Sequence, residues 1–369
     1  MTLSTSPSTM NPDERDRHWM QQCLNLAQQA YGKTAPNPMV GSVIVQNHQV
    51  VGEGFHPKAG KPHAEVFALR HAGDRAVGAT LYVNLEPCSH YGRTPPCVDA
   101  VIAANPARVV IGMVDPNPLV AGRGVAKLKQ AGIEVSVGIE EDACQRLNEA
   151  FSYRIQQQRP FGILKYAMTL DGKIATTTGH SAWVTSPAAR SHVHHLRAGC
   201  DAIIIGGNTV RRDNPLLTTH GAGDRQPLRV VMSRTLDLPI DAQIWDISIA
   251  PTWVFTESGV HPSMQKQLRN KGVEVIEYET LTPSQVMEAL DQRQCLSALW
   301  ECGGTLSAQA IATGAVQKVL AFVAPKIIGG TDAPSPVGEL GLTKMTDALP
   351  LENISWETVG PDLLITGYL

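Results

Sequence analysis

The chain has 369 residues, which is enough for two domains that each bury a core. A formal net charge of −3 and an aromatic content of 5% argue against a nucleic-acid-binding protein, which needs a basic groove and stacking side chains. The 7 cysteines form no regular framework, the first residues lack the apolar core of a signal peptide, and no run approaches the roughly 18 apolar residues of a membrane span. We therefore expect a cytoplasmic protein with reduced thiols and no membrane or nucleic-acid partner.

Helices and strands alternate through the first part of the chain. Asn11, Pro12 and Glu14 predict a helix with a capping box, and Gly32 is its expected end. The β-rich runs 40–45 and 50–55 predict a hairpin. The pattern then predicts helices from Pro62, at 96–104, near 125–131 and at 141–156, and strands at 81–85, 108–114 and 133–137. This alternation is typical of an α/β domain.

A candidate metal centre lies within this part. His63 and Glu65 fall in the expected first turn of the helix from Pro62, Cys88 follows a strand, and Cys97 opens a helix. One imidazole and two thiolates form a ligand set that suits catalytic zinc, with the fourth position open for water. Glu65 lies two residues from His63, so it is poorly placed as a ligand but can move protons. The pattern His-x-Glu, Pro-Cys and a further Cys is typical of hydrolytic zinc deaminases.

Other interpretations stay open on these residues alone. His90 could complete a closed structural zinc site, or the first domain could be a non-catalytic zinc module beside a ligand-binding domain. A structural site, however, needs no acid next to its first ligand. A tRNA-type nucleic-acid deaminase with an appended ligand-binding domain is a further alternative, against which the net negative charge argues.

The polar stretch 156–160, which ends in a proline, is the predicted boundary between domains at 1–158 and 159–369. After it, the pattern predicts a helix from Ser186 to Ala198 and strands at 161–168, 201–205, 229–232, 253–255, 273–276 and 296–300. Gly206-Gly207 and Gly303-Gly304 each follow a strand, where backbone N–H groups can bind phosphate oxygens. Alone these turns are a weak signal, and no Gly-x-Gly-x-x-Gly fingerprint occurs.

The spacing of the two cysteines carries a family resemblance. Nucleobase deaminases usually have Pro-Cys-x-x-Cys, whereas Ser-His-Tyr-Gly-Arg-Thr-Pro-Pro separates Cys88 from Cys97 here. This loop, with the segments 35–41 and 56–60, resembles the bifunctional deaminase–reductase family of riboflavin biosynthesis. The segments 164–173, 181–186, 196–197, 209–215 and 301–304 resemble its reductase half. The resemblance implies an α/β protein with an N-terminal cytidine-deaminase-like α/β/α domain and a C-terminal dihydrofolate-reductase-like α/β domain.

The resemblance also implies cofactors and site residues. Zinc is held by His63, Cys88 and Cys97, with Glu65 as the catalytic residue. The residues implied for NADPH are Ala167, Trp183, Thr209, Asp213, Gly303, Gly304, Thr305, Leu306 and Ser307. The residues implied for substrate are Asn37, His56, Lys165, Ser181, Arg197, Leu217 and Glu301.

The chain departs from the family pattern at one histidine. The family commonly has an arginine where this chain has His220, and Arg225 is a nearby substitute. Three further histidines, His192, His194 and His195, fall in a predicted helix, where we expect a solvated face rather than a second metal site.

The resemblance specifies two consecutive reactions on a small molecule, a pyrimidine ribose phosphate. We expect zinc-dependent hydrolytic deamination of 2,5-diamino-6-ribosylamino-4(3H)-pyrimidinone 5′-phosphate. NADPH-dependent reduction of the ribosyl side chain then gives 5-amino-6-ribitylaminouracil 5′-phosphate. We also expect the chain to form a homo-oligomer.

Overall fold

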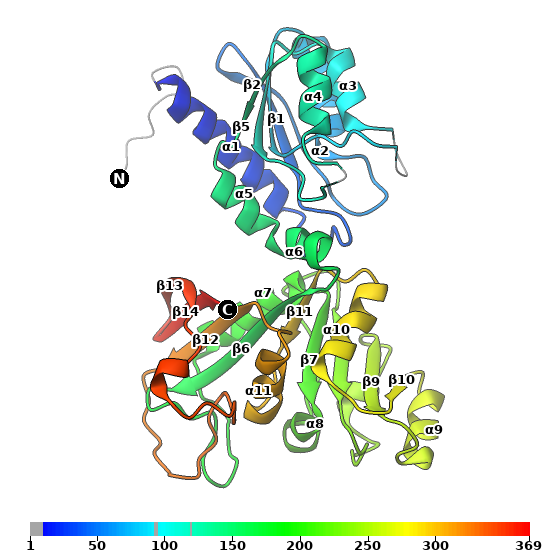
Figure 1. Cartoon of the computed structure of the whole chain (residues 1–369), viewed down its shortest axis with the longest axis vertical. Coiled ribbons are helices and arrows are strands. Elements are labelled where there is room, and N and C mark those ends of the chain that lie inside the picture. Colours follow the sequence, from blue (N-terminus) through cyan, green and yellow to red (C-terminus); the bar gives the residue numbers. More distant parts are fainter. Residues whose placement is uncertain (1–9, 92–94, 119) are drawn as a thin grey trace. The chain divides into compact units, whose positions relative to one another are not determined.

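The structure is a computed structural model that describes residues 10–91, 95–118 and 120–369. The chain forms two compact units, Met1–Gln158 and Arg159–Leu369 (Figure 1). Across the described ranges, no helix has the length and apolar character needed to cross a bilayer.

A five-stranded sheet in the order β2-β1-β3-β4-β5 forms the centre of the first unit. β1 (Gly41–Gln46) and β2 (Gln49–Phe55) form the predicted hairpin, and its turn residues Asn47 and His48 have φ of 49° and 63°, as a type I′ turn requires. β3 (Thr80–Leu85) is antiparallel to β1, whereas β4 (Arg108–Met113) and β5 (Glu134–Val137) continue in parallel with β3. The carboxyl ends of these three strands therefore share one edge of the sheet.

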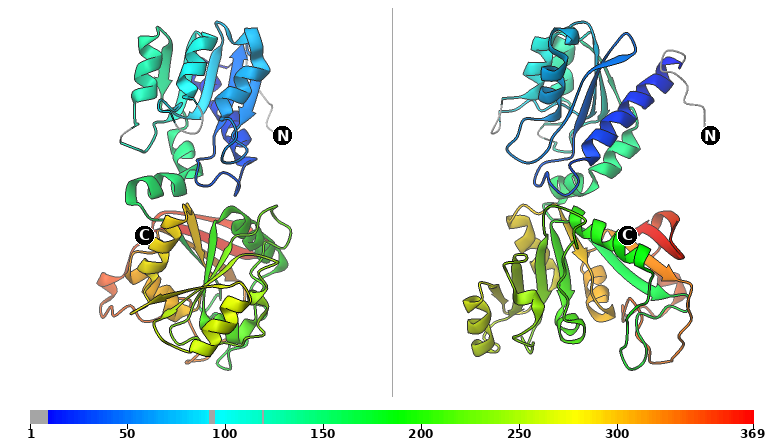
Figure 2. Two further views of the ribbon diagram at one scale, coloured as in Figure 1. Left: turned by 90° about the vertical axis from the view of Figure 1, so that its right-hand side faces the viewer. Right: turned by 180° about the vertical axis from the view of Figure 1, so that it is seen from behind.

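Helices cover both faces of this sheet (Figures 1 and 2). α1 (Pro12–Gln28) and α5 (Glu141–Leu147) pack on one face, and α2 (Ala64–Ala72), α3 (Cys97–Ala104) and α4 (Arg123–Gln130) lie on the other. α2 packs closely against β2, and only glycine fits at position 52: a Cβ there would lie 2.3 Å from the carbonyl oxygen of Ala68. The 3₁₀ turn Gly73–Ala76 follows α2, and α6 (Glu149–Gln157) ends the unit. This is the expected α/β/α arrangement.

Three predicted helix boundaries were wrong. α1 ends at Gln28, short of Gly32, because the chain turns from residue 29 onward. α2 begins at Ala64, so His63 is its N-cap and lies outside its first turn. The single helix predicted at 141–156 is divided between α5 and α6 at Asn148. The side chain of Asn148 accepts a hydrogen bond from the Met39 N–H (2.8 Å) and donates one to the Met39 carbonyl (2.9 Å), contacts that a sequence pattern does not reveal.

The second unit is built on a nine-stranded sheet in the order β10-β9-β8-β7-β11-β6-β12-β14-β13. The seven strands from β10 to β12 are parallel, and β14 and β13 are antiparallel at one edge. The strands are β6 (Phe161–Thr169), β7 (Ala202–Gly206), β8 (Leu228–Met232), β9 (Thr252–Glu257), β10 (Glu274–Tyr278), β11 (Ser297–Trp300), β12 (Lys318–Ala324), β13 (Glu352–Val359) and β14 (Asp362–Tyr368). The six predicted strands are present, and β12, β13 and β14 were not predicted.

Helices again bury both faces of the sheet. α10 (Pro283–Gln292) and α11 (Gly304–Ala312) pack on the face that carries Leu164 and Trp300. α7 (Pro187–Gly199) and α9 (Pro262–Asn270) pack against the opposite face. α8 (Gly207–Asp213) follows β7 directly, and 3₁₀ turns lie at Gln243–Trp245 and Met345–Asp347. Of these helices the sequence analysis predicted only α7, whose start is capped by Ser186 as expected.

A buried ion pair joins α1 to the sheet of the first unit. Asp16, 5% exposed, accepts two hydrogen bonds from the Arg108 guanidinium (3.0 and 2.8 Å) and one from the Tyr82 hydroxyl (2.8 Å). Arg108 also reaches the Ser136 hydroxyl (2.8 Å), so one network connects α1, β3, β4 and β5. Breaking a buried pair from one side is costly, because the remaining charge stays buried without its partner.

We expect Asp16→Asn to lower the free energy of unfolding of the first unit by about 2–3 kcal/mol, because the neutral amide removes the buried partner of the Arg108 charge and leaves it only the exposed Glu134 carboxylate. Calorimetry of the full chain should show this loss as a lower melting temperature for one unfolding transition. Glu134→Gln is the matched control: its ion pair with Arg108 (3.1 Å) has a glutamate side chain 70% exposed, so its loss should cost less than about 0.5 kcal/mol. Equal shifts for the two variants would contradict this account.

Candidate active sites

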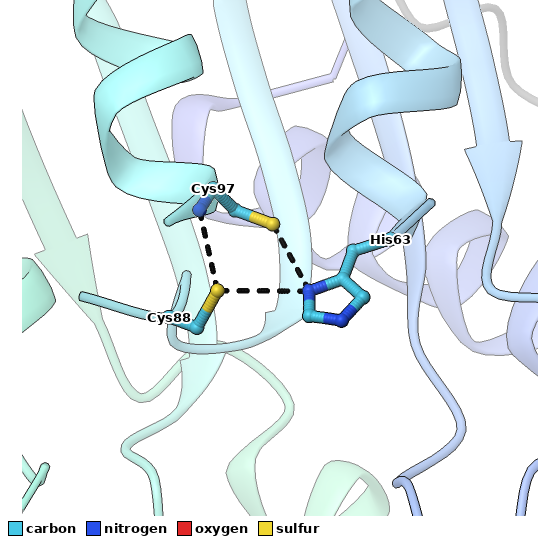
Figure 3. A group of neighbouring side chains, drawn as sticks. All are labelled: His63, Cys88 and Cys97. Atoms are coloured by element: carbon cyan, nitrogen blue, oxygen red, sulfur yellow. Dashed lines mark hydrogen bonds between the residues drawn. The ribbon is translucent and has the colours of Figure 1, made fainter. Parts of the chain in front are cut away.

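Three side chains from separate elements of the first unit converge on one point (Figure 3). His63 precedes α2, Cys88 follows β3, and Cys97 is the first residue of α3. The His63 Nδ1 atom lies 3.0 Å from the Cys97 Sγ atom and 3.6 Å from the Cys88 Sγ atom. The Cys97 N–H donates a hydrogen bond to the Cys88 sulfur (3.2 Å). The three donor atoms lie within 4.8 Å of one another.

The 3.6 Å separation of the His63 Nδ1 and Cys88 Sγ atoms fits a tetrahedral zinc ion, whereas the 3.0 Å separation from the Cys97 Sγ atom is that of a direct hydrogen bond. Bonds of about 2.3 Å to sulfur and about 2.0 Å to nitrogen separate neighbouring ligand atoms by roughly 3.5–3.8 Å. Among the residues that the structure describes, His90 is not part of this cluster, so the closed four-ligand alternative has no support. A hydrogen bond with the Cys97 thiol lowers the pKa of Cys88, which favours the thiolate that a metal needs, and the same contact raises the pKa of Cys97. The donor set is therefore chemically suited to zinc.

Glu65 lies beside the three donors in the first turn of α2, and only 3% of its surface is exposed. Its Oε2 atom is buried without a hydrogen-bond partner, which is the state expected of a group that serves a bound molecule. Burial raises the pKa of Glu65 to about 7, close to the value that suits a proton carrier at neutral pH. The side chain is not part of the donor cluster, as its position two residues from His63 predicted.

Asn37 and His56, both expected to contact substrate, lie next to this cluster. The Asn37 amide nitrogen is 3.0 Å from the His56 Nε2 atom, and the His56 ring packs edge-on against the His63 ring with centroids 5.3 Å apart. The Pro62 carbonyl oxygen lies 3.0 Å from the other His56 ring nitrogen. Because the Pro62 carbonyl accepts a hydrogen, the proton of a neutral His56 lies on Nδ1, and Nε2 accepts from Asn37. Asn37 is thereby held at the site by its own amide group.

The second unit contains a cavity of about 640 Å³ at the carboxyl ends of its parallel strands. Most residues that the resemblance implies for NADPH and substrate line it: Lys165, Ala167, Ser181, Thr209, Asp213, Glu301, Gly303, Gly304, Thr305 and Leu306. Ser307 is fully buried behind its wall. Trp183 does not line the cavity; it is 68% exposed, and the Arg190 guanidinium lies 4.4 Å from its ring centre. Leu217 and Arg197 also fall outside the lining set.

Charged side chains meet at one end of this cavity. The Arg197 guanidinium holds the Glu301 carboxylate through two hydrogen bonds (2.6 and 3.0 Å), and the Lys165 amino group lies 3.7 Å from the same carboxylate. Burial favours the neutral acid, but Arg197 and Lys165 outweigh it and hold the pKa of Glu301 at about 2. Arg197 also donates to the Thr218 carbonyl (3.0 Å), which connects it to the chain after Leu217. The group has one more positive than negative charge.

The histidines are arranged differently from the expected solvated face. His194 stacks on His220 with ring centroids 4.3 Å apart, and His192 packs against Phe322 at 5.6 Å. Only His195 of the three is exposed. Arg225 does not replace the family arginine at His220, because it is bound to the Asp201 carboxylate at 2.6 Å.

Sequence reasoning missed a group of arginines at the other end of the cavity. Arg211 and Arg212 in α8 and Arg234 after β8 line the cavity together with Ser233. Within the described part of the chain, none of the three arginines forms an ion pair with a carboxylate. Two adjacent arginines at 211–212 were a visible signal, but nothing in the sequence placed Arg234 beside them.

Known proteins are similar to this chain over nearly its whole length. Residues 13–113 match the family described as the cytidine and deoxycytidylate deaminase zinc-binding region, and residues 160–365 match the RibD C-terminal domain. The riboflavin biosynthesis protein RibD of Synechocystis sp. is 65% identical over 354 residues, 96% of each chain. RibD of Escherichia coli is 39% identical over 366 residues, 95% of this chain and 98% of that protein.

Solved structures agree with this relationship. RibD of Acinetobacter baumannii (form 1) is 39% identical with a TM-score of 0.86, covering 96% of this chain and 99% of that one. A deaminase/reductase of Thermotoga maritima is 33% identical with a TM-score of 0.86, covering 97% and 99%. The expected fold class, zinc and NADPH are confirmed, and the nucleic-acid alternative is not favoured. The chain belongs to the RibD family and is a bifunctional enzyme of riboflavin biosynthesis, with a zinc-binding deaminase domain and a reductase domain that uses NADPH.

Proposed function

We propose that residues 1–158 deaminate 2,5-diamino-6-ribosylamino-4(3H)-pyrimidinone 5′-phosphate and that residues 159–369 then reduce the ribosyl chain of the product to ribityl. The observation that carries the proposal is the convergence of His63, Cys88 and Cys97 with the buried Glu65 beside them. The Thermotoga maritima protein is named as both the deaminase and the reductase of these pyrimidine compounds, which supports the choice of substrate. Ammonia release and NADPH oxidation by the purified chain on this diaminopyrimidine test both steps together.

In the deaminase, bound zinc supplies a Lewis acid that lowers the pKa of a water molecule. We assign its binding to His63, Cys88 and Cys97. Glu65 accepts the proton of the attacking water and delivers it to the departing amino nitrogen, which leaves as ammonia. The remaining hydroxyl proton passes to the adjacent ring nitrogen as the carbonyl forms. The Asn37 amide, oriented by His56, hydrogen-bonds the pyrimidine or its ribose. His56 thus acts on substrate through Asn37.

In the reductase, NADPH supplies the hydride, and the protein positions it. Lys165 and Glu301 line one end of the cavity, and Arg197, outside the lining set, binds the Glu301 carboxylate. This group holds the substrate, whose phosphate suits the excess positive charge. The turn at Gly303-Gly304 opens α11, and its backbone N–H groups suit the cofactor phosphates. A Cβ on Gly304 would lie 2.6 Å from the Ser335 carbonyl oxygen, so this turn requires glycine.

The sheet order indicates how the cofactor lies. β7 and β11 are neighbours, and each is followed by a glycine turn and a helix, so the diphosphate belongs between them. Ala167 on β6 lies to one side, and Ser233 and Arg234 lie beyond the end of β8 on the other. We therefore assign the nicotinamide to the β6 side and the 2′-phosphate of NADPH to Arg234, Arg211 and Ser233.

The edge of the second sheet supports the expected homo-oligomer. β13 pairs only with β14 in the sheet order, and its Ile354 and Trp356 are 53% and 72% exposed. Both are large apolar side chains, and the strand has an irregular register between Glu352 and Ser355. An exposed edge strand of this kind is a site for association with another chain. We propose that β13 is the contact between copies, and that the protein acts in the cytoplasm on its small-molecule substrate.

Glu65→Gln should retain zinc and lose deamination by at least about 10²-fold, because the amide cannot carry the proton. Cys88→Ser is the matched variant at the metal: a neutral hydroxyl is a poor zinc ligand, so this chain should lose metal and deamination together. Elemental analysis measures the zinc content and ammonia release measures deamination, so together they distinguish the two variants. An active Glu65→Gln enzyme would place the proton carrier elsewhere, and a fully zinc-loaded Cys88→Ser protein would refute the ligand set.

Arg234→Ala should raise the KM for NADPH by about 10-fold or more, the effect of losing one charged hydrogen bond, and leave the KM for NADH unchanged. Steady-state reduction of the deaminated intermediate with each cofactor measures this. Arg293→Ala is the control, since Arg293 pairs with Glu274 on β10 and does not line the cavity. A parallel loss with both cofactors would show that Arg234 does not contact the 2′-phosphate.

Residues 159–369 expressed alone should bind NADPH and sediment as an oligomer, because the proposed cofactor contacts and β13 all lie within this unit. Trp356→Lys in the same fragment should give a monomer that still binds NADPH, since a charge on the apolar edge opposes association. Fluorescence titration and analytical ultracentrifugation provide the two readings. A folded fragment without NADPH affinity would contradict the assignment of the reductase to residues 159–369.

A further inference from the structure

The carboxylate of Glu86 lies two residues before the metal ligand Cys88 and is 4% exposed. It accepts four backbone hydrogen bonds. The Oε2 atom accepts from the N–H groups of Asp115 (3.1 Å) and Gly122 (2.9 Å), and the Oε1 atom accepts from Gly124 (2.8 Å) and Val125 (3.1 Å). Gly124 and Val125 lie in the first turn of α4, so Glu86 meets N–H groups that have no partner within the helix.

α4 also contacts the chain on the other side of Cys88. The Lys127 amino group in α4 donates to the Ser89 carbonyl at 3.1 Å. Gly124 packs so closely against the segment between Glu86 and Cys88 that a Cβ there would lie 2.4 Å from the Pro87 carbonyl oxygen. Residues 86, 87 and 89 are thus all held by α4, and Cys88 lies between them. Its own carbonyl accepts from the Val98 N–H at 3.1 Å.

We propose that Glu86 is a positioning residue of the deaminase, which sets the sulfur of Cys88 for metal binding by fixing its loop to α4. The inference rests on the zinc site of the proposed function. An ionised carboxylate suits the role because it only accepts hydrogen bonds and has about four acceptor positions, one for each N–H group here. A glutamine has the same shape, but its amide nitrogen would turn hydrogens toward two of the four N–H groups.

The first test is Glu86→Gln in the full chain, with zinc affinity measured by competition with a chelator. We expect the affinity to fall by about 10- to 100-fold, the range seen when groups that orient metal ligands are changed. The deaminase kcat at saturating zinc should fall by about 10-fold. Reduction of the deaminated intermediate with NADPH should be unchanged, which shows that the chain is folded and active in its other unit.

Asp16→Asn tests whether Glu86 has a merely structural role, because Asp16 belongs to the same unit but lies at the other end of its strands from the zinc site. Asp16 binds Arg108 at the start of β4, whereas the Glu86 N–H donates to the Met113 carbonyl at the end of β4. Asp16→Asn should lower the melting temperature without changing the zinc affinity of the folded protein. If Glu86→Gln weakens zinc no more than Asp16→Asn does, the proposal is wrong.

Lys127→Met keeps the test decisive if Glu86→Gln does not fold. The Lys127 side chain is 44% exposed, so its loss is well tolerated. The substitution removes the Ser89 contact and a 3.9 Å ion pair with Asp99, whose carboxylate is 48% exposed and which therefore contributes little. We expect a smaller loss of zinc affinity, about 3-fold, in the same direction. An unchanged affinity would refute the role of α4 in holding Cys88. Failure of the wild-type chain to bind zinc would instead refute the proposed function.

Discussion

In both units, the reacting groups stand at the carboxyl ends of parallel strands, and this constraint determines the rest of each site. β3 and β4 run in parallel, so Glu86, Cys88 and the segment after Met113 emerge at one edge of the first sheet. β7 and β11 are likewise parallel neighbours in the second sheet. The helices that follow these strands begin at the same edge, so unpaired N–H groups gather there and attract negative groups. In the first unit the Glu86 carboxylate accepts hydrogen bonds from these N–H groups. In the second unit we assign the N–H groups of the turn after β11 to the phosphates of the cofactor.

The two sites use buried charge in opposite ways. At the deaminase site, burial outweighs the opposing effect of His63 on Glu65, and the pKa of Glu65 rises to about 7. At the reductase site, Glu301 is also nearly buried, but Arg197 and Lys165 keep it ionised. The same residue type is therefore suited to proton transfer in one unit and to fixed electrostatic binding in the other. The sequence does not reveal this difference between Glu65 and Glu301, because the partners of Glu301 lie more than one hundred residues away along the chain.

The sequence was informative wherever chemistry depends on residue type and local spacing. The hairpin at Asn47 and the glycine turns were predicted because each is defined by a few neighbouring residues, and the zinc donors were predicted because short motifs mark each of their three segments. It was uninformative where long-range contacts decide the structure. Asn148 interrupts a helix because it binds Met39, and the apolar run of β12 becomes a strand by pairing with β6. The arginines at 211 and 234 line the same cavity because β7 and β8 are adjacent, and the stacking of His194 on His220 has the same long-range origin.

The zinc donors come from three segments of the first unit, at residues 63, 88 and 97, which the metal can join only when that unit is folded. Metal binding therefore adds directly to the folding free energy of this unit, and NADPH acts in the same way on the other. Each contribution grows with the logarithm of ligand concentration over its dissociation constant. The lifetime of the two halves consequently depends on different cellular supplies. Removal of zinc therefore lowers the folding free energy of the first unit and leaves that of the second unchanged.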